Sequence, residues 1–216
     1  MTNTMLKAGA IATLVCGLGL GGTTRSLADN RLAPFRTPVH FDGLLNDHTP
    51  ASVKNGPYEM HGRWSLDLPE RGGAARFSAS MDMQTTDAGN IDQNDPTTRG
   101  AHTHHISMTD GVVTNTWDTS CPAFNPAVTG GFVVTGNAQV TGNGGPPPFG
   151  NPTPVTVCVL GVANAAPGEA HVKYSNITLT FTMPASGHFG PQAIHGVVTR
   201  CAGQWGFAAD DCTLEQ

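Results

Sequence analysis

Charged and aromatic side chains are scarce in this sequence. Asp, Glu, Lys and Arg make up 12% of its 216 residues, and Phe, Trp and Tyr make up 6%. No segment shows a sustained helical period of apolar residues, whereas glycine (27) and proline (16) are frequent. This profile argues against a helical protein and is typical of a turn-rich β protein.

Long apolar runs are also missing, apart from a short one near the N-terminus. Lys7 precedes an apolar run over residues 8–20, and small residues at Ser26 and Ala28 occupy the positions that a signal peptidase reads. The run is too short and too rich in glycine for a membrane span, and no later segment resembles one. Residues 1–28 are therefore predicted to be a removable secretory signal, which makes the protein periplasmic or extracellular.

Basic side chains are few in the remaining chain. Without the predicted signal, nine basic residues face sixteen acidic ones, a net charge of −7. This balance argues against a nucleic-acid partner, because phosphate binding needs a basic face. Motifs of serine hydrolases and of phosphate-binding loops are absent as well. A small-molecule ligand remains as the expected kind of partner, and the sequence carries no signal for an oligomeric state.

Four cysteines follow the predicted signal. An even number in an exported chain favours disulfides over a metal cluster, and no Cys-x-x-Cys spacing indicates a redox pair. Four cysteines allow three connectivities, and the sequence does not choose among them. Cys201 and Cys212 enclose a short loop and form the favoured pair, which leaves Cys121 with Cys158. Each bridge is expected to stabilise the fold by about 2–4 kcal/mol.

The rest of the chain reads as one β domain. Residues 29–57, with four spread prolines, are expected to be irregular, and the domain is assigned to residues 58–216. Residues 58–68 and 75–83 alternate apolar and polar side chains, as expected of a hairpin with one buried face. About eight such strands predict an all-β, disulfide-stapled, antiparallel barrel or sandwich, and the sequence does not separate the two.

Two further stretches of the sequence predict how strands run and where they are buried. Asp110-Gly111 is a dipeptide typical of a two-residue hairpin turn, so a return strand is expected directly after it. Residues 155–162 are apolar at both parities, which predicts a strand that is buried on both faces.

The stretch "AHTHHISM" concentrates three histidines in four positions. Residues two apart in a strand share a face, so His102 and His104 are expected to point the same way as Ile106, into the core. His105 is expected to face solvent. Two imidazoles on one strand face can chelate one ion, and a third ligand has to come from elsewhere in the chain.

His188 and His195, in a glycine-containing segment, are the expected third ligands. His61 is a weaker option, because its parity places it on the wet face. Three imidazoles suit zinc or copper, so one divalent ion of either metal is the expected cofactor. Met81 and Met83 on a neighbouring inward face favour Cu(I) through their thioethers, although methionine is also a common core residue.

Two functional hypotheses follow. In the first, the exported barrel or sandwich holds a histidine-bound metal ion, with no reaction assigned. In the second, the protein is a non-catalytic small-ligand-binding barrel or a structural secreted protein, and Met108, Trp64 and His61 line the cavity. Convergence of His102 and His104 on a third histidine favours the first hypothesis.

Overall fold

The computed structural model describes most of the chain beyond residue 37. The described residues are 38–53, 56–69, 73–85, 101–115, 118–121, 130–143, 147, 149–163, 171–203, 208–209 and 213–215. The predicted signal therefore lies outside them.

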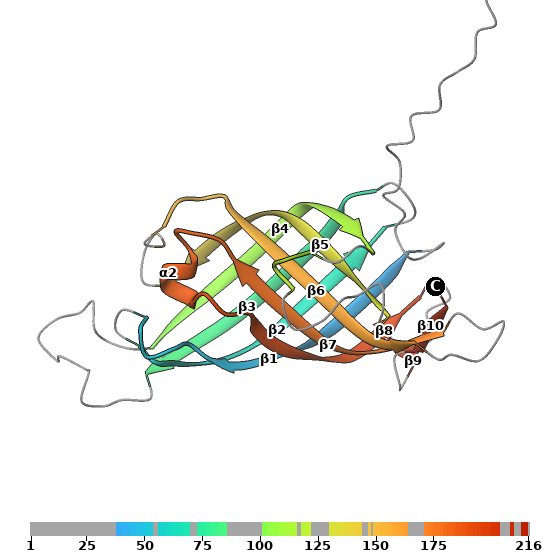
Figure 1. The fold of residues 1–216 in the computed structure, drawn as a ribbon, viewed down its shortest axis with the longest axis horizontal. Helices are drawn as coiled ribbons and strands as arrows, with labels where there is room; N and C mark the ends of the chain where they lie inside the picture. The colour runs from blue at the N-terminus through green and yellow to red at the C-terminus, as the bar shows by residue number, and fades with distance from the viewer. Residues whose placement is uncertain are drawn as a thin grey trace, which may run out of the picture.

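The described residues form antiparallel strands and one short helix (Figure 1). The elements are β1 (Val39–His48), β2 (Tyr58–Leu68), β3 (Ala75–Thr85), β4 (His102–Thr114), β5 (Gly131–Gly142), β6 (Thr153–Ala163), β7 (His171–Phe181), α2 (Ser186–Phe189), β8 (Ile194–Ala202), β9 (Ala208–Ala209) and β10 (Thr213–Glu215).

Strands β1 to β8 close into a barrel. Each strand pairs with the next one in the chain, and β8 pairs with both β7 and β1. Because this closure leaves no free edge among the eight strands, the fold is an up-and-down barrel and not a sandwich. The all-β prediction is confirmed, and the alternative between barrel and sandwich is settled by the β1–β8 and β7–β8 pairings.

Alternating side chains fill the barrel. In β2 and β3 every second residue is buried, as the sequence pattern predicts. The indole of Trp64 occupies space beside its cross-strand partner Gly43, where an added Cβ would lie 2.4 Å from Trp64 Nε1. The interior of the barrel is therefore a packed core and not an open channel.

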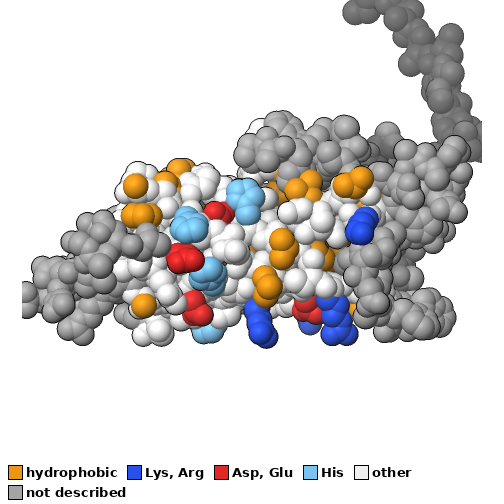
Figure 2. Space-filling view, turned by 90° about the horizontal axis from the view of Figure 1, so that it is seen from below, with side chains coloured by type: hydrophobic (Ala, Val, Ile, Leu, Met, Phe, Trp, Pro, Cys, Tyr) orange, Lys and Arg blue, Asp and Glu red, His pale blue; other side chains and the backbone are white. Residues whose placement is uncertain are grey.

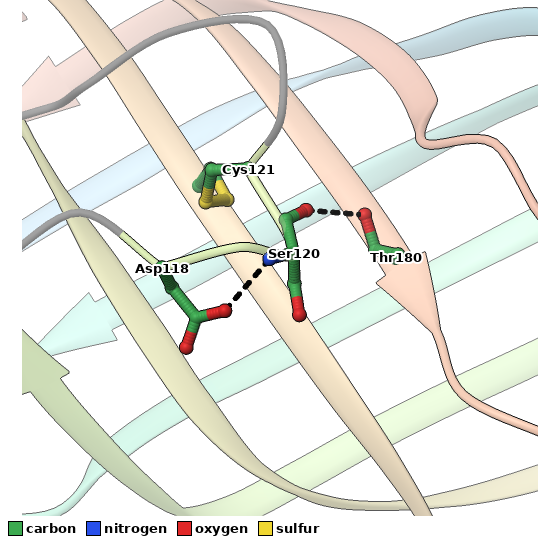
Figure 3. Close-up of a disulfide and its surroundings, with 5 residues drawn as sticks. Asp118, Ser120, Cys121 and Thr180 are labelled. Carbon is green, nitrogen blue, oxygen red and sulfur yellow. Dashed lines mark hydrogen bonds between the residues drawn. A yellow bond between two sulfur atoms is a disulfide. The ribbon is translucent and has the colours of Figure 1, made fainter.

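Strand β6 is buried on both faces over residues 155–159, as predicted, whereas Val162 near its end is 70% exposed. Its outer face is covered by residues 118–121, which a disulfide between Cys121 and Cys158 ties to the wall (Figure 3). Thr180 on β7 donates a hydrogen bond to the carbonyl of Ser120 at 3.0 Å. The disulfide between Cys121 and Cys158 confirms this predicted pair. Cys201 is disulfide-bonded too, but its predicted partner Cys212 lies outside the described residues.

Two predictions about the strands are wrong. Asp110 and Gly111 do not form a hairpin, because β4 runs through them to Thr114 with a register shift against both neighbouring strands. Gly111 instead permits close packing, since an added Cβ would lie 2.7 Å from Val134. The expectation of an irregular segment over 29–57 is also wrong for Val39–His48, which forms β1.

Helix α2 lies at one end of the barrel, and β9 and β10 lie at the other (Figure 1). The strand ends that meet near α2 include the start of β4, which carries the clustered histidines. Within the part of the chain that the structure describes, no helix is long and apolar enough to cross a membrane.

Candidate metal centre

Three histidine side chains converge at the α2 end of the barrel. His188 Nε2 lies 2.9 Å from His104 Nε2 and 3.2 Å from His102 Nε2. One ligand atom of each ring lies within 4.8 Å of the others. We call this group the three-histidine centre. It brings together the predicted pair and one of the two predicted third ligands.

The start of β4 directs His102 and His104 into the barrel. Thr103, between them, faces outward, where its hydroxyl donates to Asp82 at 2.7 Å and its backbone N–H donates to Asn143 Oδ1 at 3.0 Å. These bonds tie β4 to the neighbouring strands on both sides. Gly142, the cross-strand partner of His104, leaves room for the imidazole, since an added Cβ would lie 3.3 Å from Nδ1.

Helix α2, at one end of the barrel, supplies the third imidazole, His188. The next residue, Phe189, is fully buried and stacks on Phe181 with ring centroids 4.5 Å apart. Gly190 ends the helix with φ +98°, and an added Cβ there would lie 2.7 Å from Pro50. A side chain at position 190 would therefore both strain the backbone and push the segment away from the barrel. Packing, more than the helix itself, holds His188 in place.

The centre favours neutral imidazoles. Burial lowers the pKa of His104 to about 3, with further lowering by His188 and His102, while the Thr141 backbone acts in the opposite direction. Burial also lowers the pKa of His188 to about 4, followed by the effect of His102. Neutral imidazole is the form that binds metal ions, so no proton has to be displaced from these rings near neutral pH.

The distances fit a metal ion better than a hydrogen-bonded network. An imidazole nitrogen carries either one hydrogen or one lone pair, so His188 Nε2 can share only one proton with its two close neighbours. A tetrahedral ion with metal–nitrogen bonds of about 2.0–2.1 Å places its ligand nitrogens about 3.3 Å apart. The two separations from His188 Nε2, 2.9 and 3.2 Å, are close to this value, and all three ligand atoms lie within 4.8 Å of one another.

Aromatic side chains lie around the centre, and no buried carboxylate accompanies them among the residues that the structure describes. The Tyr58 ring meets His102 edge-on with centroids 5.2 Å apart, and Phe149 lies 5.9 Å from His188. Among the described residues, the buried polar side chains are hydroxyls and one imidazole: Thr49, His104, Thr153, Thr156, Thr178 and Ser186. The donor set therefore favours metals that prefer nitrogen over oxygen ligands.

The other two predicted histidines lie on the outer wall. His195 Nδ1 is 2.7 Å from Asp47 Oδ2, and His61 Nε2 is 2.8 Å from Glu59 Oε1. Figure 2 shows histidine and acidic side chains next to one another on one outer face of the barrel. His195 and His61 are thus separated from the three-histidine centre by the barrel wall, and neither is part of the convergent group.

The predicted cavity residues lie apart from one cavity that the described residues form. Met108 and Trp64 are core residues, and His61 is exposed. An open cavity of about 750 Å³ lies at the end opposite α2, where its lining includes His40, Asp67 and Arg76. Its volume is in the range of small-molecule pockets, but it is remote from the three-histidine centre.

Sequence reasoning missed the residues that shape the centre. Tyr58 begins a strand after a proline, Phe149 lies in a Gly/Pro-rich segment, and Gly142 ends a strand. Nothing local in the sequence connects these positions to the histidines, since they lie on other strands or on connections between strands.

Comparison with known protein families, curated proteins and solved structures gives no match for this chain. Its function is therefore argued from the geometry of the centre.

Proposed function

We propose that the protein is an exported metal-binding protein that holds one zinc or copper ion through Nε2 of His102, His104 and His188. The observation that carries this proposal is the convergence of three ring nitrogens, with His188 Nε2 at 2.9 and 3.2 Å from the other two. The N-terminal sequence supports export, because it has the features of a cleavable signal.

Zinc and copper are the favoured ions for three reasons. All three ligands are imidazoles, which suit these metals. No carboxylate is buried among the described residues, so the hard oxygen ligands that calcium, magnesium and manganese prefer are missing from the core. The low pKa values of His104 and His188 keep these ligands in the binding form at mildly acidic pH as well.

Three protein nitrogens leave the fourth position of a tetrahedral ion to another ligand. A site with an exchangeable fourth ligand supports Lewis-acid or water-activating chemistry, and a fully protein-bound ion is structural or stored. The packing around the centre suits either use, because Phe189 stacks on Phe181 and Gly190 fits closely against Pro50, which positions α2.

The test compares two histidines of the same segment. Full-length protein, exported by its own signal and purified without a tag, is analysed for metal content alongside His188→Ala and His195→Ala. We expect about one equivalent of zinc or copper in the wild type and in His195→Ala, and a loss of most of it in His188→Ala, because three-ligand sites depend on each ligand.

Circular dichroism spectra of the three proteins show whether the barrel persists. Equal metal content in His188→Ala and His195→Ala would contradict the proposal, as would a wild type that binds neither metal after removal and readdition of the ions. A small molecule bound at the opposite end would be retained in both variants.

A further inference from the structure

Buried methionines lie directly beside the three-histidine centre. In the pairing of β3 with β4, Met81 is the partner of His104 and Met83 is the partner of His102. Both methionines have no exposed surface and belong to the barrel core. Two thioether side chains and two imidazoles thus form adjacent cross-strand pairs on the inner face.

These pairings place each methionine directly across from an imidazole on the inner face. Directly opposed residues of antiparallel strands have Cβ atoms about 4.5–5.5 Å apart. Methionine is unbranched with three rotatable bonds, so its Sδ can occupy many positions around such a neighbour.

The charge of the surroundings selects among ions. Three imidazoles and a thioether are all neutral, and no carboxylate is buried among the described residues to balance a bound cation. The cost of burying an ion in a medium of low dielectric constant grows with the square of its charge, so it is about four times smaller for a monovalent than for a divalent ion of equal size. Soft thioether ligands select Cu(I) as well.

We infer that the Met81–Met83 pair completes the three-histidine centre with a thioether ligand, and that the centre binds Cu(I) in preference to Zn(II). This inference rests on the metal-binding function proposed above. A thioether in the fourth position leaves none for water, so the site holds copper and does not activate a substrate. The proposed role of the site is to hold a cuprous ion, shielded from solvent, in an exported protein.

The experiment compares two pairs of buried methionines. Metal-free full-length protein is loaded with Cu(I) under anaerobic conditions and titrated against a chromogenic Cu(I) chelator, and separately with Zn(II) against a zinc chelator. The test variant is Met81→Leu/Met83→Leu. The matched control is Met60→Leu/Met108→Leu. These two residues are also buried, and neither pairs with a histidine of the three-histidine centre. Methionine-to-leucine changes conserve volume and are well tolerated in cores.

We expect the test variant to lose about 10–100-fold in Cu(I) affinity, the size of effect seen when the support of a metal site is removed, with Zn(II) affinity unchanged. The control pair should match the wild type for both ions. X-ray absorption of the Cu(I)-loaded wild type should show sulfur as well as nitrogen ligands. This last measurement needs no variant and decides the case even if the test variant fails to fold.

Two results would overturn the inference. One is a first shell of nitrogen or oxygen alone in the Cu(I)-loaded wild type. The other is equal Cu(I) affinity in the two double variants. If zinc binding that depends on His188 persists in either case, the proposed function stands and only the thioether assignment falls. If the wild type binds neither ion, the proposed function falls with it.

Discussion

At the α2 end of the barrel the pKa values of His104 and His188 are lowered, whereas at the opposite end the pKa of His40 is raised. His104 is 4% exposed and has other imidazoles as neighbours. Burial alone lowers the pKa of His40 too, but its contacts with Asp67 at 2.6 Å and Asp42 at 3.0 Å outweigh that effect.

The comparison separates two uses of the same side chain. A histidine between carboxylates at the surface becomes a cation held in an ion pair. A buried histidine without a carboxylate stays neutral and keeps a nitrogen lone pair for a metal ion. The absence of buried acidic residues among those described is therefore as informative about the centre as the presence of three imidazoles.

The largest expected effect concerns acid stability of the metal-free protein. His104 has a pKa of about 3 in the folded state and about 6.5 when unfolded, so the unfolded chain binds more protons between these values. The free energy of unfolding should fall as pH drops below 6.5, by about 1.4 kcal/mol per pH unit and by at most about 5 kcal/mol in total from this residue. Urea unfolding at about pH 7 and at about pH 4.5 measures the slope.

The matched variant is His104→Leu, which removes the titrating group and places an apolar side chain beside Met81. Its stability should depend less on pH over this interval than that of the wild type. Equal slopes for the two proteins would show that burial does not hold His104 neutral, and the contrast with His40 would be lost.

A smaller effect is expected from Gly142→Ala. The new Cβ would lie 3.3 Å from His104 Nδ1 and 3.1 Å from the carbonyl of Thr103, so the imidazole has to move by a few tenths of an ångström. We expect a loss of about tenfold in metal affinity, as is usual when the support of a ligand is disturbed. The control is Gly187→Ala, next to His188, where an added Cβ meets nothing within 4 Å. Metal titration that ranks Gly187→Ala as the weaker binder would argue against a preformed His104 position.

The smallest effect is expected at the opposite end. Asp67→Asn removes one carboxylate from His40, so the pKa of His40 should fall towards its ordinary value, as followed by NMR titration of the ring protons. At pH values below the raised pKa of His40, losing this pair should lower the free energy of unfolding by under about 1 kcal/mol, because the pair is solvent-exposed. Asp82→Asn, which removes a carboxylate that bonds to Thr103, should leave the His40 titration unchanged. A His40 titration that is insensitive to Asp67→Asn would refute the ion pair.

The alternation of apolar and polar residues along a strand correctly predicted on which face its side chains lie. The inward direction of His102 and His104 follows from their spacing relative to Ile106, and the buried outer face in the middle of β6 follows from apolar residues at both parities. The prediction failed near proline and glycine. The prolines that predicted an irregular segment lie on either side of β1, at Pro38 and Pro50, and Gly111 serves close packing where a turn was expected.

The third ligand shows why the centre could be predicted only in part. His188 and His195 lie seven positions apart in similar sequence surroundings, and nothing local distinguishes them. The structure separates them because Phe189 packs into the barrel end beside Phe181 and carries His188 inward, whereas His195 lies in β8 with its side chain on the outer wall.

The sequence by itself determined the strand character of the chain and the shared face of His102 and His104, because each depends on spacing or parity along one stretch. It favoured the Cys121–Cys158 pair among three possible connectivities, and the structure decided it. Only the tertiary structure decided that the strands close into a barrel and that His188, Met81 and Met83 lie beside the histidine pair. These relations join residues far apart in the chain, and they arise from strand register and core packing, which no local pattern contains.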